Sequence, residues 1–147
     1  EPNARGAIFG LTRNSGPREF ARAALEAVCF QTKDLVEAML ADIHIDLDQL
    51  GLRVDGGMVA SEWTMQFLSD TLGCPVDRPE VIETTALGAA WLAGYTTGVW
   101  PDQRTFAKRW QLDRRFEPRL DVEARQTNYK TWKAAIEATI AQSKASP

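Results

Sequence analysis

The sequence predicts an α/β domain, and three features lead to that class. Apolar residues recur at helical spacing from Pro17, from residue 61 and again from Asp121. Between the first two of these stretches, Leu52 and Val54 alternate with other residues at the period of a β-strand. The predicted strands are few and short, and so small a sheet does not cover the apolar faces of three helices. We therefore expect further strands from a part of the protein that precedes this chain.

The first helix is predicted to begin at Pro17, which suits the first helical position. Glu19 favours the positive end of that helix. Before it, residues 6–11 fit either a short strand or a glycine-containing loop, and residues 12–16 have the composition of a turn. The apolar positions that repeat at helical spacing are Leu25, Val28, Cys29, Val36, Met39, Leu40 and Ile43.

A strand, a glycine turn and a second helix are predicted to follow as one unit. The strand covers 50–55 and ends at the pair Gly56 and Gly57. The helix covers 61–72, and Gly73 supplies its C-terminal stop. A glycine pair at the end of a strand indicates either a positive φ or a surface that comes very close to the main chain.

Residues 74–79 contain two prolines, so they are predicted to form only a short or edge strand. A third helix is predicted within 83–98, with Thr84 or Thr85 as its cap and Gly98 at its end. Small side chains along this helix ordinarily mean close packing against another element. These small residues are Ala86, Ala89, Ala90, Ala93 and Gly94.

The C-terminal part of the chain is predicted to end in a long helix. Residues 105–118 fit irregular structure or an edge strand. The helix begins at about Asp121, whose carboxylate can cap it. Its apolar face carries Tyr129, Trp132, Ile136 and Ile140.

Composition excludes several classes of protein. The 147 residues amount to one domain, and 17 Lys and Arg against 20 Asp and Glu leave a formal net charge of -3. There is no basic excess of the kind that binds nucleic acid or an anionic membrane. Cys29 and Cys74 lack the spacing of a zinc site or a disulfide framework, so reduced cytosolic thiols are expected. No stretch has the roughly 18 apolar residues of a membrane span. The first residue is not Met, which favours a fragment.

The glycine turn is the segment best suited to chemistry, because ligands of open α/β sheets bind beyond the carboxyl ends of strands. The turn is neither GxxxxGK[ST] nor GxGxxG, which excludes a P-loop and a dinucleotide-binding fingerprint. Two Cα atoms without side chains offer a flat patch on which a planar base or a ribose can lie at van der Waals distance. The pattern alone leaves a structural turn and a ligand contact both open.

Four segments resemble the C-terminal part of the FGGY carbohydrate kinases, and most of all the glycerol kinases among them. These segments are VDGG at 54–57, MQF at 65–67, DRPEV at 77–81 and ETTALGAA at 83–90. The resemblance extends over nearly the whole chain. It implies a partial RNase H-like lobe of the actin, hexokinase and Hsp70 type, with residues 1–147 as the C-terminal, nucleotide-side domain, shortened at its N-terminal end.

The resemblance also implies where a nucleotide binds. In glycerol kinases the second glycine of the pair and an Asn four residues later contact the adenosine part of ATP or ADP. By position these are Gly57, with Gly56 beside it, and Ser61. Ser61 departs from the family pattern, because a hydroxyl offers one donor on a shorter arm than a carboxamide. It fits the N-cap of the 61–72 helix equally well.

The activity implied by the resemblance is transfer of the γ-phosphoryl group of ATP, with Mg²⁺, to glycerol, giving glycerol 3-phosphate. In the family the catalytic acid, the Mg²⁺ ligands and the glycerol site precede this part, so no catalytic or metal-binding residue is assigned and the chain alone is expected to be inactive. The intact enzyme is expected to be a cytoplasmic homo-oligomer without nucleic-acid or membrane partners. Two alternatives stay open: another FGGY sugar kinase such as xylulokinase, and a non-catalytic interaction or regulatory module.

Other notable side chains are expected to have structural roles. Asp55 is expected to accept backbone N–H bonds in the turn that follows its strand. Glu62 is expected to favour the first turn of its helix. His44, at a helix end, is not expected to be catalytic. The five tryptophans are expected to pack against other residues: Trp63, Trp91, Trp100, Trp110 and Trp132.

Overall fold

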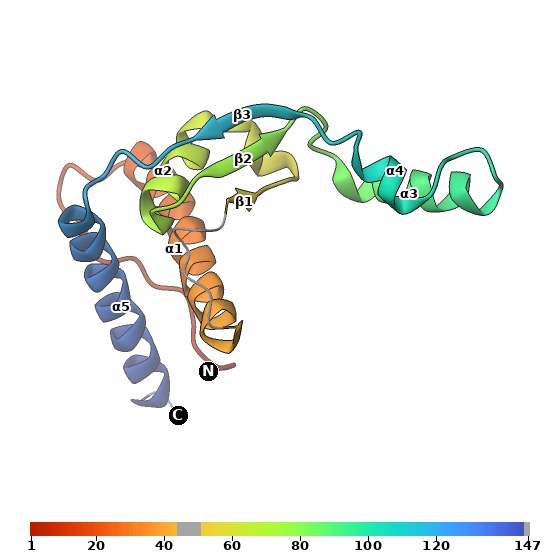
Figure 1. Cartoon of the computed structure of the whole chain (residues 1–147). Coiled ribbons are helices and arrows are strands. Elements are labelled where there is room, and N and C mark those ends of the chain that lie inside the picture. The colour runs from red at the N-terminus through yellow and green to blue at the C-terminus, as the bar shows by residue number, and fades with distance from the viewer. Residues whose placement is uncertain (44–50, 146–147) are drawn as a thin grey trace.

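The structure, a computed structural model, describes residues 1–43 and 51–145 and confirms the α/β class (Figure 1). Helix α2 lies against a small sheet, α1 and α5 pack on α2, and α3 and α4 project beyond the end of the sheet. His44 and Leu50 lie outside the described residues. The described elements are α1 (Pro17–Ile43), β1 (Leu52–Arg53), the 3-10 helix η2 (Gly57–Ala60), α2 (Glu62–Leu72), β2 (Val76–Pro79), α3 (Thr84–Thr96), α4 (Gln103–Ala107), β3 (Leu112–Phe116) and α5 (Val122–Ala145).

The described strands form one sheet in the order β1, β2, β3. β1 is parallel to β2, with Leu52 opposite Val76, and β3 is antiparallel to β2, with Phe116 opposite Val76. β2 is short, as predicted, but it is the central strand and not an edge strand. Pro75 precedes β2, and Pro79 is its last residue, where the register with β3 shifts. Because the prolines stand at the two ends, the hydrogen bonds between them are kept.

The strand predicted over 50–55 is shorter in the structure, where β1 has two residues. Hydrogen bonding to β2 continues briefly, since the Val54 N–H donates to the Asp77 carbonyl at 3.1 Å. The Gly56 N–H then donates to the carbonyl of Ile82 at 2.8 Å instead. The chain leaves the sheet at this point because Gly56 has a φ of 87°.

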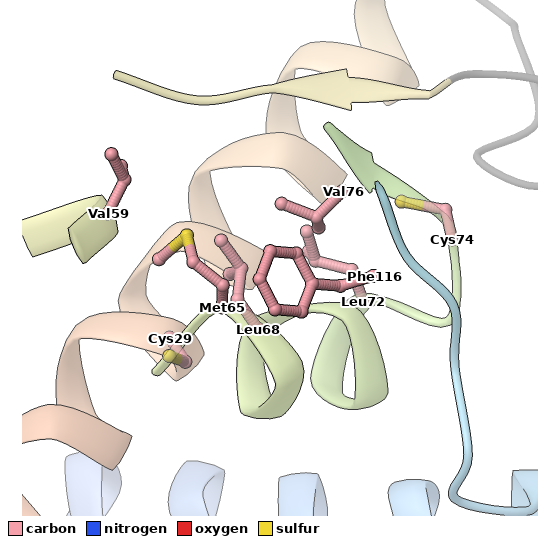
Figure 2. Close-up of a cluster of buried hydrophobic side chains, with 8 residues drawn as sticks. All are labelled: Cys29, Val59, Met65, Leu68, Leu72, Cys74, Val76 and Phe116. Carbon is pink, nitrogen blue, oxygen red and sulfur yellow. The ribbon is translucent and has the colours of Figure 1, made fainter. Parts of the chain in front are cut away.

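The hydrophobic core lies between the sheet and α2 (Figure 2). Val76 and Phe116 point from the strands towards the apolar side chains of α2. Neither cysteine forms a disulfide, and both are buried in this core; burial raises the pKa of the Cys29 thiol to about 12, so it stays protonated at neutral pH. The buried cluster consists of Cys29, Val59, Met65, Leu68, Leu72, Cys74, Val76 and Phe116.

The first and last helices begin where the sequence predicts. The Glu19 carboxylate accepts a hydrogen bond from the Gly16 N–H at 2.9 Å, just before α1. The Asp121 carboxylate caps α5 by accepting from the Ala124 N–H at 2.7 Å, as predicted. The ambiguity at residues 6–11 is resolved as a loop, because the described segment before α1 contains neither helix nor strand.

Contacts between α1 and α5 combine ring stacking with hydrogen bonds. The ring of Trp132 stacks on Phe30 with 5.4 Å between centroids. Its indole N–H donates to the Asp34 carboxylate at 2.8 Å. The Tyr129 hydroxyl donates to the same carboxylate at 2.5 Å. Trp132 is therefore a packing residue, as predicted, and its hydrogen bond to Asp34, together with that of Tyr129, fixes how the two helices lie against each other.

The helix predicted within 83–98 is confirmed as α3, but its predicted cap is wrong. The N-cap residue is Glu83, which makes no side-chain cap bond in the described part of the chain, and Thr84 is already the first helical residue. The short helix α4 was not predicted, although Asp102 caps it by accepting from two backbone N–H groups. β3 is the edge strand that residues 105–118 allowed.

Although every residue of α3 is described, none of them is buried. The predicted close packing holds at Gly94, where an added Cβ would lie 2.7 Å from Cγ of Trp100. Leu92 and Tyr95 are both more than half exposed. Four of the small residues are exposed as well: Ala86, Ala89, Ala90 and Ala93. A helix with apolar residues on all sides is ordinarily buried, so α3 leaves unusual apolar surface open.

Candidate functional site

The glycine turn connects β1 to α2 through η2, a short helix that the sequence did not predict. Gly56 is the residue before η2 and has φ 87° and ψ 173°, a conformation that residues with side chains rarely adopt. Gly57 begins η2 and has no positive φ. Of the two predicted reasons for the glycine pair, positive φ therefore applies to Gly56 alone.

The space over both glycines is open. Among the described residues, and apart from the chain neighbours of each glycine, no heavy atom lies within 4 Å of a Cβ built on Gly56 or Gly57. Gly57 thus has neither a strained φ nor a neighbouring atom that would keep a side chain out. Its lack of a side chain is consistent with the second reason, the close approach of something that binds to this surface.

The turn is fastened to the segment that leads into α3. The Gly56 N–H donates to the Ile82 carbonyl at 2.8 Å, and the Thr84 hydroxyl donates to the Asp55 carboxylate. The prediction that Asp55 accepts backbone N–H bonds in its own turn is therefore wrong, because its partner in the described part of the chain is the Thr84 side chain. Because β1 and β2 are parallel, the segments that follow them meet at the same end of the sheet, where α/β proteins bind ligands.

Ser61 is the N-cap of α2, as predicted. Its side-chain oxygen accepts from the Thr64 N–H at 3.3 Å and from the Thr64 hydroxyl at 2.9 Å. A hydroxyl has two acceptor sites and one donor, so these two bonds leave the O–H of Ser61 able to donate to a ligand. The cap therefore does not exclude a ligand contact at the same side chain.

Ion pairs hold the turn from the side of β2 and β3. Glu62 lies in the first turn of α2, as predicted, and also pairs with Arg114 at 2.5 Å. Arg78 is largely buried and pairs with Asp113 at 2.6 Å, and its Nη1 donates to the Val59 carbonyl of η2 at 3.0 Å. These contacts fix η2 against the sheet, so the surface over the glycines is preformed.

Among the described residues, no three or more His, Cys, Asp or Glu side chains are grouped so that they could hold a metal ion. None of the described helices combines the length and the hydropathy needed to cross a membrane.

One feature near the turn was missed by sequence reasoning, a hollow of about 430 Å³ beside α3 and α4. Trp100 and Trp110 line it, and Gly56, Gly57 and Ser61 do not. Both rings also pack against other side chains of the chain, which agrees with the packing role predicted for the tryptophans. No sequence pattern predicts this hollow, because its walls come together only in the folded chain.

Comparison with known proteins identifies the family. The profile of the C-terminal domain of the FGGY family of carbohydrate kinases matches residues 1–97, and the chain belongs to this family. Its relatives include the glycerol kinase of Rhizobium meliloti (strain 1021), which is 62% identical over 140 residues. That alignment covers 95% of this chain and 28% of the relative, so the chain spans little more than a quarter of the relative's length.

Solved structures of the family have the same fold. The chain is similar to the Plasmodium falciparum glycerol kinase crystallised with ADP, with a TM-score of 0.78 and 32% identity over 93% of this chain and 27% of that one. It also matches the xylulose kinase of Rhodospirillum rubrum, with a TM-score of 0.74 and 24% identity over 98% of this chain and 29% of that one. The predicted lobe of the actin and hexokinase type is thereby confirmed.

Proposed function

We propose that this chain forms the C-terminal, adenosine-side domain of a glycerol kinase, which transfers the γ-phosphoryl group of ATP to glycerol and gives glycerol 3-phosphate. The observation that carries the proposal is the identity of 57–62% with curated glycerol kinases over nearly the whole chain. Among solved structures, the Plasmodium falciparum glycerol kinase matches at 32% identity and three xylulose kinases at 22–26%, which supports glycerol over a sugar as the acceptor. We further propose a cytoplasmic, homo-oligomeric enzyme, as in the family.

The adenosine part of ATP or ADP is proposed to lie over Gly57, with Gly56 beside it and the Ser61 hydroxyl as a donor. The open space over both glycines supports this placement, as does the ordinary φ of Gly57. ATP supplies the phosphoryl group, and Mg²⁺ neutralises charge on its phosphates. The Mg²⁺ ligands, the catalytic acid and the glycerol site are proposed to lie in a preceding N-terminal lobe, so this chain alone is inactive.

A fusion protein tests the activity. The part of the Rhizobium meliloti glycerol kinase that precedes the matched stretch is joined to this chain, and ATP-dependent phosphorylation of glycerol is measured. We expect turnover by the fusion protein and none by the 147 residues alone. A folded but inactive fusion protein contradicts the proposal, and turnover by the isolated chain contradicts the division of roles between the lobes.

Substitution of Gly57 tests the nucleotide contact. Gly57→Val places a side chain in open space without a positive φ, so it should leave the free protein folded. It occupies the position proposed for the base, and overpacking of about 1–3 kcal/mol weakens binding by a factor of about 5 to 160. ADP affinity of the fusion protein is measured by calorimetry. Gly6→Val is the matched control, because Gly6 also has no heavy atom within 4 Å among the described residues.

The same measurement separates the kinase from a non-catalytic interaction module. In a module the glycine turn has no ligand, so Gly57→Val and Gly6→Val would leave ADP affinity equally unchanged. A loss confined to Gly57→Val supports the nucleotide site. Equal affinities would instead place the base elsewhere and favour the module.

A further inference from the structure

We propose that the hollow beside α3 and α4 binds a small aromatic anion, a planar ring that carries one carboxylate, sulfonate or phosphate group. Its volume of about 430 Å³ falls within the range of roughly 300–1,000 Å³ that is usual for small-molecule sites. Its walls include Arg53 at the end of β1, Pro79 at the end of β2 and Thr84 at the start of α3. The hollow thus lies at the carboxyl ends of two parallel strands, the usual position of ligand sites in α/β folds.

Aromatic rings form one wall of the hollow. Trp100 and Trp110 are both half-buried, so part of each indole stays accessible to a ligand. Phe106 of α4 also lines the hollow and stacks on Trp100, with 5.2 Å between ring centroids. This stacking helps to hold the Trp100 ring in place. A planar ligand ring can therefore stack on an indole that is already ordered.

Two guanidinium groups stand over the same rings. Arg53 lies 4.1 Å from the centroid of Trp110, and Arg109 lies 5.9 Å from the centroid of Trp100. Both arginines line the hollow, and within residues 1–43 and 51–145 neither forms an ion pair. Glu80 is the acidic residue in the lining. Two positive charges against one negative charge favour an anionic ligand.

Asp77 of β2 interacts electrostatically with Arg53 but is already hydrogen-bonded to another arginine. Its carboxylate accepts hydrogen bonds from Nε and Nη2 of Arg115, both at 2.7 Å. The planar fork of Arg53 is thereby left for an outside carboxylate or phosphate, which guanidinium groups bind in a bidentate manner. A site that offers both ring stacking and a charge-assisted hydrogen bond suits a ligand that combines a planar ring with an anionic group.

The probe is 2-naphthoate, and 2-naphthamide is its neutral analogue of the same shape. Binding to the fusion protein described above is followed by NMR at the tryptophan indole N–H groups and by calorimetry. We expect naphthoate to bind at least about tenfold more tightly than naphthamide. Arg53→Gln and Arg109→Gln should each weaken naphthoate binding about tenfold. Arg104→Gln, on α4 but outside the lining, is the matched control and should change nothing.

Three outcomes would overturn the proposal. Equal affinity for the acid and the amide would mean apolar adsorption, for which the exposed surface of α3 suffices. Absence of binding at millimolar naphthoate would mean that the hollow takes no such ligand. Displacement of naphthoate by ADP would assign the hollow to the nucleotide site and not to a separate ligand. The comparison of acid and amide needs no variant, so it decides the matter even where an arginine variant does not fold.

Discussion

Ser61 combines a structural role with a proposed ligand contact, and two substitutions separate them. Ser61→Asn introduces the residue that the resemblance to glycerol kinases implies for this position. Asn caps helices as well as Ser does, so the free energy of unfolding should change by less than about 0.5 kcal/mol. Its carboxamide reaches further towards the proposed adenosine. One additional hydrogen bond is worth about 0.5–1.5 kcal/mol, so the affinity for ADP should rise about two- to twelvefold.

Ser61→Ala removes the cap and the ligand donor together. The Thr64 N–H loses an acceptor at 3.3 Å, a long hydrogen bond, and the Thr64 hydroxyl loses one at 2.9 Å. We therefore expect a loss of about 1 kcal/mol, the middle of the range for cap deletions. For a chain of this length that lowers the melting temperature by about 2–4 °C. The affinity for ADP should fall, in contrast to the gain with Asn.

Thermal unfolding of the 147-residue chain and ADP calorimetry of the fusion protein give the two readouts. The reasoning is refuted if Ser61→Asn destabilises the chain as much as Ser61→Ala does, because the cap would then need a hydroxyl. It is refuted on the ligand side if neither substitution changes ADP affinity. Ser61 would in that case be a cap and nothing more.

Three further substitutions test the contacts that hold the fold. Ser69→Ala should lower the free energy of unfolding by about 1–3 kcal/mol, measured with urea, because the single O–H donor of this buried side chain is shared between two backbone carbonyls, at 3.0 and 2.9 Å. Tyr129→Phe should lower it by about 0.5–1.5 kcal/mol, since it removes the donor to Asp34 but keeps the ring. The hydrogen bond from Arg115 holds the pKa of the Asp77 carboxyl below its ordinary 3.8, so this carboxylate stabilises the fold above that pH. The advantage in unfolding free energy over Asp77→Asn should therefore shrink as the pH falls below about 4.

Each of these predictions has an outcome that contradicts it. Ser143→Ala is the control for Ser69→Ala, because Ser143 lies on α5 and, among the described residues, its side chain bonds only to the Ile140 carbonyl of its own helix, at 2.8 Å. Equal effects of the two serine variants would mean that the buried bonds of Ser69 contribute nothing. An unchanged stability of Tyr129→Phe would exclude a role for its hydroxyl between α1 and α5. If the difference in unfolding free energy between the unchanged chain and Asp77→Asn did not vary with pH, the ion pair would be excluded as the cause of that difference.

The features predicted correctly are those that neighbouring residues determine. The helices α1, α2 and α5 are long enough for their apolar periodicity to appear in the sequence. The Ser61 cap and the Gly73 stop depend only on residues within one helical turn, and both are confirmed. Positive φ, one of the two possible reasons for the glycine pair, is confirmed at Gly56, although the sequence could not say which of the two glycines has it.

The features that were missed depend on contacts between distant segments or on elements too short to show a period. α4 has five residues, fewer than two helical turns. β2 is central because β3 pairs with it, and no pattern within residues 74–79 reveals that pairing. Thr84 serves as a partner of Asp55, 29 residues away, and not as a local cap. The hollow likewise needs walls from four elements, so only the folded chain reveals it.

Hydrogen bonds join the glycine turn to the start of α3, so a movement of one also displaces the other. Since no residue of the fully described α3 is buried, its first turn is held to the sheet chiefly by Thr84 and by the adjoining Ile82 carbonyl. Any segment that packs on α3 in a larger assembly would therefore also restrict movement of the glycine turn, the proposed contact for adenine. The exchange rate of the Gly56 amide hydrogen, which is bonded to the Ile82 carbonyl, measures how often this contact opens.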